Sequence, residues 1–148
     1  MTKKLDSIEK ELAKLDRAYR SAIYQVYTKE KTIQLSIAQP NQILDLLLSQ
    51  ENRFTWAFVT AHNPHSQCLS VAENHQRHQS LIRFLATQDV IIFDGVGKDK
   101  DGFWTPETSI LILGINLEDA ISLGRKFQQN AIVYGELGKI SQLLWIEY

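Results

Sequence analysis

Phe54-Thr-Trp-Ala-Phe-Val-Thr-Ala61 is apolar at nearly every position, and the rest of the fold can be worked out from this stretch. A strand with one wet face alternates apolar and polar residues, whereas a continuous apolar run is typical of a strand covered on both faces. We therefore expect residues 54–61 to form a central strand of a sheet.

Helices and strands alternate in the sequence that follows. A turn-rich loop leads to Ser70-Val-Ala-Glu73, which has the spacing of a capping box and predicts a helix from about Val71 to near Thr87. Beyond it we expect a short buried strand, a glycine-rich charged loop, an apolar strand, a helix capped by Asn116 and a closing hairpin, at residues 90–93, 94–102, 109–115, 117–127 and 131–146.

Two helices and a hairpin are expected before the central strand. Over residues 5–19 the apolar positions recur at steps of three and four, which predicts an amphipathic helix whose stripe packs on the core or on a partner. Two β-branched and aromatic runs, 22–27 and 32–37, predict a hairpin around a polar turn. Asn41 is the expected N-cap of a mostly buried helix over residues 42–50.

The order of these elements decides the fold class. A length of 148 residues fits one domain with a single core. Because hairpins lie near both ends, a purely parallel sheet is disfavoured. We predict an α+β fold with a mixed, mostly antiparallel sheet and about four helices packed on it.

Composition excludes several classes of protein. The 16 Lys and Arg residues nearly cancel the 17 Asp and Glu residues, which argues against nucleic-acid binding through a basic surface. The single cysteine, Cys68, fits a reducing compartment. No apolar run has the length of a membrane span, and the N-terminal residues form a charged helix pattern where a signal peptide would have an apolar core. We therefore expect a cytoplasmic protein without a membrane partner.

The loop after the central strand is the first candidate for a functional site. It carries His62, Asn63, His65 and Ser66, and Ser70 follows. A loop between a buried strand and a helix is exposed on rigid flanks, and the amides of a helix N-terminus attract anions. The alternative is that the Asn-Pro step forms a turn and the serines are caps.

Polar residues also fall on the apolar face of the long helix. A projection at about 100° per residue places Asn74 and His78 there. A buried polar group without a hydrogen bond costs roughly 1–3 kcal/mol. Asn74 therefore either satisfies backbone groups or lines a pocket, and His78 is either a core histidine or a catalytic one.

The last helix poses a similar choice. Gly124 and Gln128 face inward in the same projection, and we expect a large side chain to pack on Gly124. Gln129 and Asn130 follow, and they either cap the end of the helix or hydrogen-bond a ligand.

No metal site or cofactor is predicted. All four histidines fall within residues 62–78, but their spacing matches no zinc motif. Gly95-Val-Gly-Lys98 lacks the spacing of a phosphate-binding loop, and the acidic residues after it are too few for an EF-hand.

Four separated segments carry a family resemblance. They are residues 60–64 with Ser66, Leu69 and Ser70; Glu73-Asn74 with Arg77; residues 104–107 with Ser109; and residues 124–134. On these segments the chain from Tyr19 to Trp145 resembles the bacterial and phage proteins grouped as domain of unknown function 3293. We therefore expect an N-terminal amphipathic helix over residues 1–18, outside the resemblance, and a single α+β domain over residues 19–148.

The resemblance also singles out polar residues without giving them a mechanism. It implies that the family pattern includes Asn63, Asn74, Arg77, Glu107, Gln129 and Asn130. The chain departs from that pattern at His62, where an aromatic residue is usual, and at Gln128, where glycine is usual. A role for His62 would therefore be specific to this protein.

Two classes of function remain, and the residues favour the first slightly. In the first, the chain binds a small polar or anionic ligand in a cleft, with Arg77 as the anion partner and, if the site is catalytic, Glu107 as the general base. The expected ligand-binding residues are Asn63, Ser66, Asn74, Arg77, Gln129 and Asn130. In the second, these groups only tie loops to the core, and the chain is a non-catalytic interaction module that uses its first helix or an exposed sheet edge. A homodimer through the first helix is one form of this second class. Whether the chain is an enzyme is left open.

Overall fold

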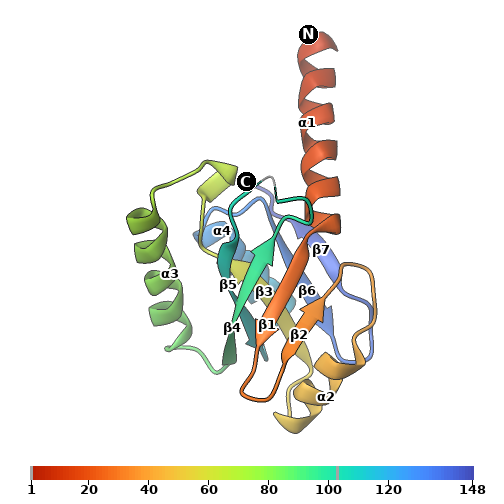
Figure 1. Ribbon diagram of the computed structural model, residues 1–148, viewed down its shortest axis with the longest axis vertical. Coiled ribbons are helices and arrows are strands. Elements are labelled where there is room, and N and C mark those ends of the chain that lie inside the picture. Colours follow the sequence, from red (N-terminus) through yellow and green to blue (C-terminus); the bar gives the residue numbers. More distant parts are fainter. Residues whose placement is uncertain (1, 103) are drawn as a thin grey trace.

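The strands join one antiparallel sheet in the computed structural model, which describes residues 2–102 and 104–148 (Figure 1). Their order across the sheet is β2-β1-β4-β5-β3-β6-β7, and every neighbouring pair is antiparallel. The bounds are β1 Ile23–Tyr27, β2 Thr32–Leu35, β3 Thr55–Thr60, β4 Ile91–Lys98, β5 Glu107–Leu113, β6 Ala131–Glu136 and β7 Gln142–Trp145. The predicted α+β class is confirmed.

Helices connect and cover these strands. They are α1 Thr2–Ser21, α2 Gln42–Gln50, α3 Val71–Leu85 and α4 Leu117–Lys126, with a short 3₁₀ turn at Pro64–Ser66. The predicted N-caps are confirmed: Asn41 accepts from the Leu44 amide at 3.0 Å, and Asn116 accepts from the Asp119 amide at 2.8 Å. Ser70 and Glu73 form the predicted capping box at the start of α3.

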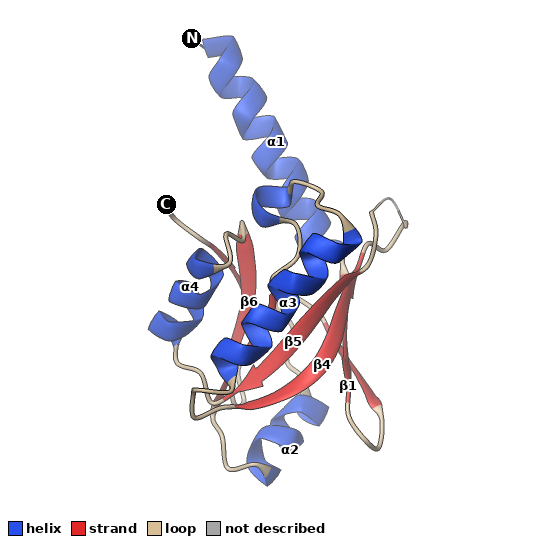
Figure 2. Cartoon of the chain, turned by 90° about the vertical axis from the view of Figure 1, so that its left-hand side faces the viewer, coloured by secondary structure: helices blue, strands red, loops and turns tan. Residues whose placement is uncertain are grey.

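The central strand β3 contributes to both faces of the sheet, as its apolar sequence predicts. Ala57 and Val59 pack with residues of α3 and α4, which lie over one face (Figure 2). Trp56 and Phe58 point the other way and join a second cluster with Leu44 and other residues of α2 and the β1–β2 hairpin. The alternation of a strand thus produces two apolar layers from one continuous run.

Helix α1 stands apart from this arrangement and extends beyond the sheet (Figure 1). None of its residues is buried, and Leu5, Ile8 and Leu12 are 57%, 47% and 48% exposed. Only its last turns contact the fold, where Asp16 accepts from the Trp145 indole at 3.0 Å. Within residues 2–102 and 104–148, no helix combines the length and the apolar character needed to cross a membrane.

Strand β4 is longer than the sequence predicts, because part of the expected glycine-rich loop belongs to it. Gly95 pairs with Val26 on one side and Ser109 on the other. A Cβ at Gly95 would lie 2.6 Å from the Gln25 carbonyl oxygen and 2.8 Å from the Phe58 ring. The glycine therefore permits a close approach of backbone and ring inside a strand, instead of forming a loop.

The end of α4 corrects the prediction for Gln128. Its side chain is exposed, whereas Gln129 is buried. Gln128 has φ +56°, and the Gln128 and Gln129 amides donate to Arg125 and Gly124, which is the bonding of a Schellman motif. The helical projection was wrong here because the helix ends at Lys126. Gly124 does face large side chains: a Cβ there would lie 2.9 Å from Ile146 and 3.0 Å from Ile132.

Candidate functional site

A hollow opens on the side of the sheet opposite α3 and α4, at the end where α1 joins the fold. Its empty volume is about 580 Å³, with the open solvent at its mouth included. Its lining mixes aromatic, aliphatic and uncharged polar side chains with one carboxyl group, and comes from α1, six strands and three loops. The lining residues are Tyr19, Tyr24, Phe58, Thr60, Asn63, Ser66, Gly97, Trp104, Glu107, Ser109, Gln129, Asn130, Ala131, Ile132, Val133 and Leu143.

Strand register explains why there is space at this place. Tyr24, Gly97 and Glu107 form one row across β1, β4 and β5, so all three lie on the same face. Gly97 has no side chain to fill the space between Tyr24 and Glu107. The Phe58 ring lies against Gly95 in the next row and makes an edge-to-face contact with Tyr24 at 5.4 Å. The two glycines of β4 therefore shape the floor of the hollow.

Glu107 is the carboxyl group of the hollow. Its Oε2 accepts from the Asn63 amide nitrogen at 2.9 Å. Burial raises the pKa of the Glu107 carboxyl to about 7, although the Asn63 bond acts in the opposite direction. Near neutral pH this group therefore exists in both protonation states, which is the property required of an acid or base catalyst.

Asn63 is held in place by Asn74. The Asn63 backbone amide donates to Asn74 Oδ1 at 2.9 Å, and Asn74 Nδ2 donates to Asn63 Oδ1 at 2.9 Å. The Leu69 amide also donates to Asn63 Oδ1, at 3.0 Å. These bonds leave Nδ2 of Asn63 to face Glu107. Asn74 thus positions a lining residue without lining the hollow itself.

A second set of bonds joins the loop after β3 to the end of α4. Arg77 donates from Nε to the Ala61 carbonyl at 2.6 Å and from Nη2 to the Phe127 carbonyl. Gln129 Nε2 donates to the carbonyls of His62 and Phe127, at 3.0 and 3.1 Å. The Arg77 guanidinium therefore holds the two loops together, and burial lowers the pKa of Arg77.

The rim brings together residues far apart in the chain. Asn130 Nδ2 donates to Ser66 Oγ at 2.7 Å, and the Tyr19 hydroxyl lies 3.2 Å from the same oxygen. Asn63, His65 and Ser66 have φ of +49°, +51° and +61°. A non-glycine residue in this region costs on the order of 1–3 kcal/mol, and such residues cluster at binding and catalytic sites.

Comparison with family models finds a match over residues 59–132, to the family described as protein of unknown function (DUF3293). The match spans half of the 148 residues. The chain belongs to this family. No curated protein and no solved structure matches it.

The DUF3293 match contains all of the polar residues that the sequence singled out as a site. The structure brings five of them to the hollow: Asn63, Ser66, Glu107, Gln129 and Asn130. Asn74 and Arg77 lie behind this group and bond to it or to loop carbonyls. The family resemblance implies glycine at Gln128, and the positive φ there gives the physical reason.

Sequence reasoning missed the aromatic part of the lining. Tyr19 and Tyr24 lie outside the DUF3293 match. Phe58 lies in β3, and Trp104 lies in the loop before β5. Aromatic residues in apolar patterns predict a core, so none of the four was predicted as a site residue, although Trp104 lies in a segment that carries the family resemblance. A further signal was the pair of glycines in a β-branched and apolar context, which indicates close packing or open space within a strand.

The histidines lie away from the hollow. His62 and His78 contact each other edge to face at 6.2 Å, and burial is the main cause that lowers the pKa of both. His78 is buried as predicted, and its Nδ1 has no hydrogen-bond partner among the described residues. In the described part of the chain, no three His, Cys, Asp or Glu side chains gather in a way that could hold a metal ion.

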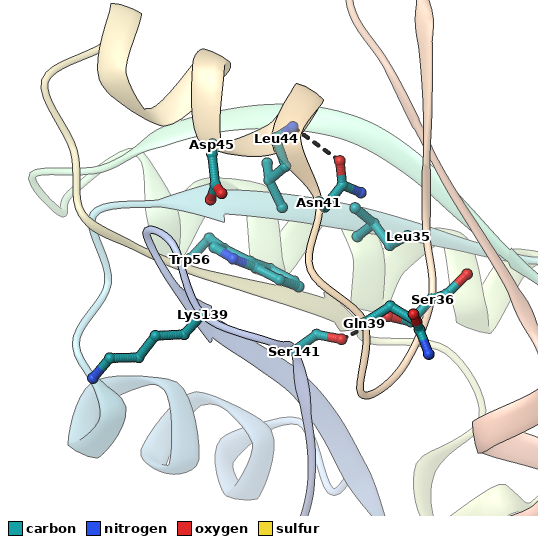
Figure 3. Close-up of a pocket in the computed structure, with 9 residues that line it drawn as sticks. All are labelled: Leu35, Ser36, Gln39, Asn41, Leu44, Asp45, Trp56, Lys139 and Ser141. Atoms are coloured by element: carbon teal, nitrogen blue, oxygen red, sulfur yellow. Dashed lines mark hydrogen bonds between the residues drawn. The ribbon is translucent and has the colours of Figure 1, made fainter.

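A second, smaller hollow lies between α2 and the β6–β7 turn (Figure 3). Several of its polar groups are already bonded to the protein. Asn41 caps α2, Ser141 donates to the Ser36 carbonyl at 2.6 Å, and Asp45 accepts from the Gly138 amide at 3.1 Å. This hollow lies where α2 packs against the β6–β7 turn, and its carboxyl group, that of Asp45, is bonded to that turn.

Proposed function

We propose that this DUF3293 protein binds a small, partly apolar ligand in the hollow around Glu107. One observation carries the proposal: five polar side chains expected from the sequence converge on one concavity with an aromatic floor. Small-molecule sites in proteins commonly combine an apolar lining with a few convergent polar groups. The titrating carboxyl of Glu107 would receive a proton from the ligand or give one to it.

The geometry changes the class of ligand that we favour. An anionic ligand was expected on the basis of Arg77, but its guanidinium bonds to the Ala61 and Phe127 carbonyls and to Gln128 Oε1. No Lys, Arg or His is among the described residues that line the hollow. We therefore favour a neutral or cationic ligand over an anionic one.

Triad hydrolysis is not the function that we favour. The lining hydroxyl of Ser66 has Tyr19 and Asn130 as its partners, and neither is the imidazole or carboxylate that activates the serine of a triad. Glu107 is the group that we propose for any proton transfer, with Asn63 and Asn74 as positioning residues.

The binding proposal can be tested by following backbone amide chemical shifts while the neutral probe benzyl alcohol is added. The expected shifts lie at residues that line the hollow, such as Gly97, Ser109 and Asn130, and they saturate. Replacing Gly97 with leucine fills the hollow. A Cβ at Gly97 would make only ordinary contacts, the nearest at 3.7 Å to the Tyr24 ring, so a side chain can begin there without a shift of the backbone.

The matched control is Val96→Leu, which enlarges the neighbouring side chain on the opposite face of β4. We expect Gly97→Leu to abolish the saturating shifts and Val96→Leu to preserve them. Shifts that survive Gly97→Leu, or that lie elsewhere on the surface, would contradict the proposal.

We infer a second candidate function, self-association through α1. The observation that favours it is the exposed apolar stripe of Leu5, Ile8 and Leu12 on a helix with no buried residue. Apolar residues at alternating steps of three and four form the seam of two-stranded coiled coils.

Light scattering after size-exclusion chromatography tests this second function. We expect a mass twice that of the single chain at high protein concentration. Leu12→Glu should return the chain to a monomer, whereas Ala13→Glu adds the same charge beside the stripe and should not. A monomer at every concentration would exclude the homodimer.

A further inference from the structure

We propose that the ligand of the hollow is an organic cation, an amine on a small apolar body, with Glu107 as its counter-ion. This inference rests on the proposed binding function and narrows it to one chemical class. It depends on three features of the hollow: its charges, its aromatic rings and the second oxygen of Glu107.

The first feature is an unbalanced charge. Glu107 is the carboxylate among the described lining residues, and no Lys, Arg or His accompanies it there. Its hydrogen bond comes from an uncharged amide, that of Asn63. Glu107 is partly buried, and withdrawing a carboxylate from water is costly unless a cation or several hydrogen bonds compensate it. A bound ammonium group would supply the missing positive charge.

The second feature is a set of four aromatic side chains that line the same hollow as that carboxyl group. Tyr19, Tyr24, Phe58 and Trp104 reach the hollow from α1, β1, β3 and the loop before β5. The faces of aromatic rings attract cations, and the attraction increases when the site excludes water. An aromatic surround with one carboxylate therefore selects cations by two mechanisms.

The third feature is free hydrogen-bonding capacity. Asn63 occupies Oε2 of Glu107, and Oε1 has no donor among residues 2–102 and 104–148. An ammonium group can donate to Oε1 while its apolar body lies against Phe58 and Leu143. Because burial raises the pKa of Glu107 to about 7, cation binding should strengthen as the carboxyl ionises above neutral pH.

The test compares benzylamine, benzyl alcohol and benzoate, which share a ring and carry a cationic, neutral or anionic group. Each is titrated into the chain at pH 6 and pH 8, with amide chemical shifts as the readout. At pH 8 we expect benzylamine to bind about ten-fold more tightly than benzyl alcohol. That preference should fall by about five-fold at pH 6, where Glu107, with a pKa of about 7, is mostly protonated.

Two variants separate the sources of the preference. Glu107→Gln should make benzylamine and benzyl alcohol equivalent at both pH values, while benzyl alcohol still binds. Trp104→Leu, in a loop, should weaken benzylamine more than benzyl alcohol, by about three-fold.

The outcomes distinguish this inference from the function on which it rests. Equal binding of benzylamine and benzyl alcohol at pH 8, or a preference for benzoate, would overturn the cation inference and leave the binding site in place. Failure of all three probes to bind would overturn both. A benzylamine preference that persists in Glu107→Gln would overturn the role of Glu107.

Discussion

At the scale of single residues, Glu107 has the most consequence, because its carboxyl is partly buried and no Lys, Arg or His is among the described residues that line the hollow with it. Its pKa is raised from 4.5 to about 7 in the folded chain. Ionisation therefore favours unfolding, and the stability contributed by the protonated group is present below pH 4.5 and is lost as the pH rises to about 7. Glutamine keeps the shape and an acceptor for Asn63 but cannot ionise.

We predict that Glu107→Gln changes stability little at pH 4.5 and raises the free energy of unfolding at pH 8 by on the order of 1–3 kcal/mol. Urea denaturation at the two pH values measures this difference. The same effect at both pH values would mean that Glu107 has an ordinary pKa.

Gln128 allows a second prediction at this scale. It has a left-handed backbone, φ +56°, and its side chain accepts from Arg77 at 3.2 Å. Gln128→Gly relieves the backbone strain and loses that bond, whereas Gln128→Ala loses the bond and keeps the strain. We expect the glycine variant to be more stable than the alanine variant by about 1 kcal/mol, as measured by thermal unfolding. Equal stability would show that the turn carries no strain.

Residue types predicted part of the site, but not the direction of each side chain. Asn63, Glu107 and Asn130 stood out in the sequence and line the hollow. Arg77 stood out equally and braces two loops instead. The difference depends on which backbone carbonyls come within reach after folding, and a pattern of residue types carries no information on that.

At the scale of secondary-structure elements, β4 provides the clearest test of why the hollow exists. A Cβ at Gly95 would meet the Gln25 carbonyl and the Phe58 ring, whereas a Cβ at Gly97 has ordinary contacts. We predict that Gly95→Ala lowers the free energy of unfolding by about 1–3 kcal/mol and that Gly97→Ala changes it by less than about 0.5 kcal/mol. Chemical denaturation measures both. Equal losses would argue against a specific packing role for Gly95.

Most helices and strands could be predicted because short stretches of sequence indicate them. The caps of α2, α3 and α4 and the two terminal hairpins follow from short patterns of residues, and the structure confirms them. The extension of β4 through Gly95 was not predictable in this way, because glycines ordinarily indicate loops. Only the pairing with β1 and β5 explains a strand there.

At the scale of the whole molecule, we expect α1 to be separable from the folded body. Its residues before Asp16 have no hydrogen bond to another described element, and none is buried. We predict that deleting residues 2–14 changes the free energy of unfolding by less than about 0.5 kcal/mol, in urea denaturation at concentrations where the full chain is monomeric. A loss of several kcal/mol would show that the helix belongs to the core.

The hollow is formed only when the whole chain has folded, because no single element lines it. Its lining comes from α1, six strands and three loops, so the four aromatic residues meet through strand order and register. The sequence predicted the sheet and both hairpins, but the order β1-β4-β5-β3-β6 results from long-range pairing. The aromatic character of the hollow could not be predicted without that order.

The crystal structure of the chain soaked with benzyl alcohol tests the binding proposal most directly. We predict electron density for the ring within the hollow, with the hydroxyl about 3 Å from a polar atom of Asn63, Glu107, Gln129 or Asn130. Crystals of Gly97→Leu treated in the same way should lack it. A probe bound only outside the hollow, or bound unchanged in Gly97→Leu, would contradict the proposal.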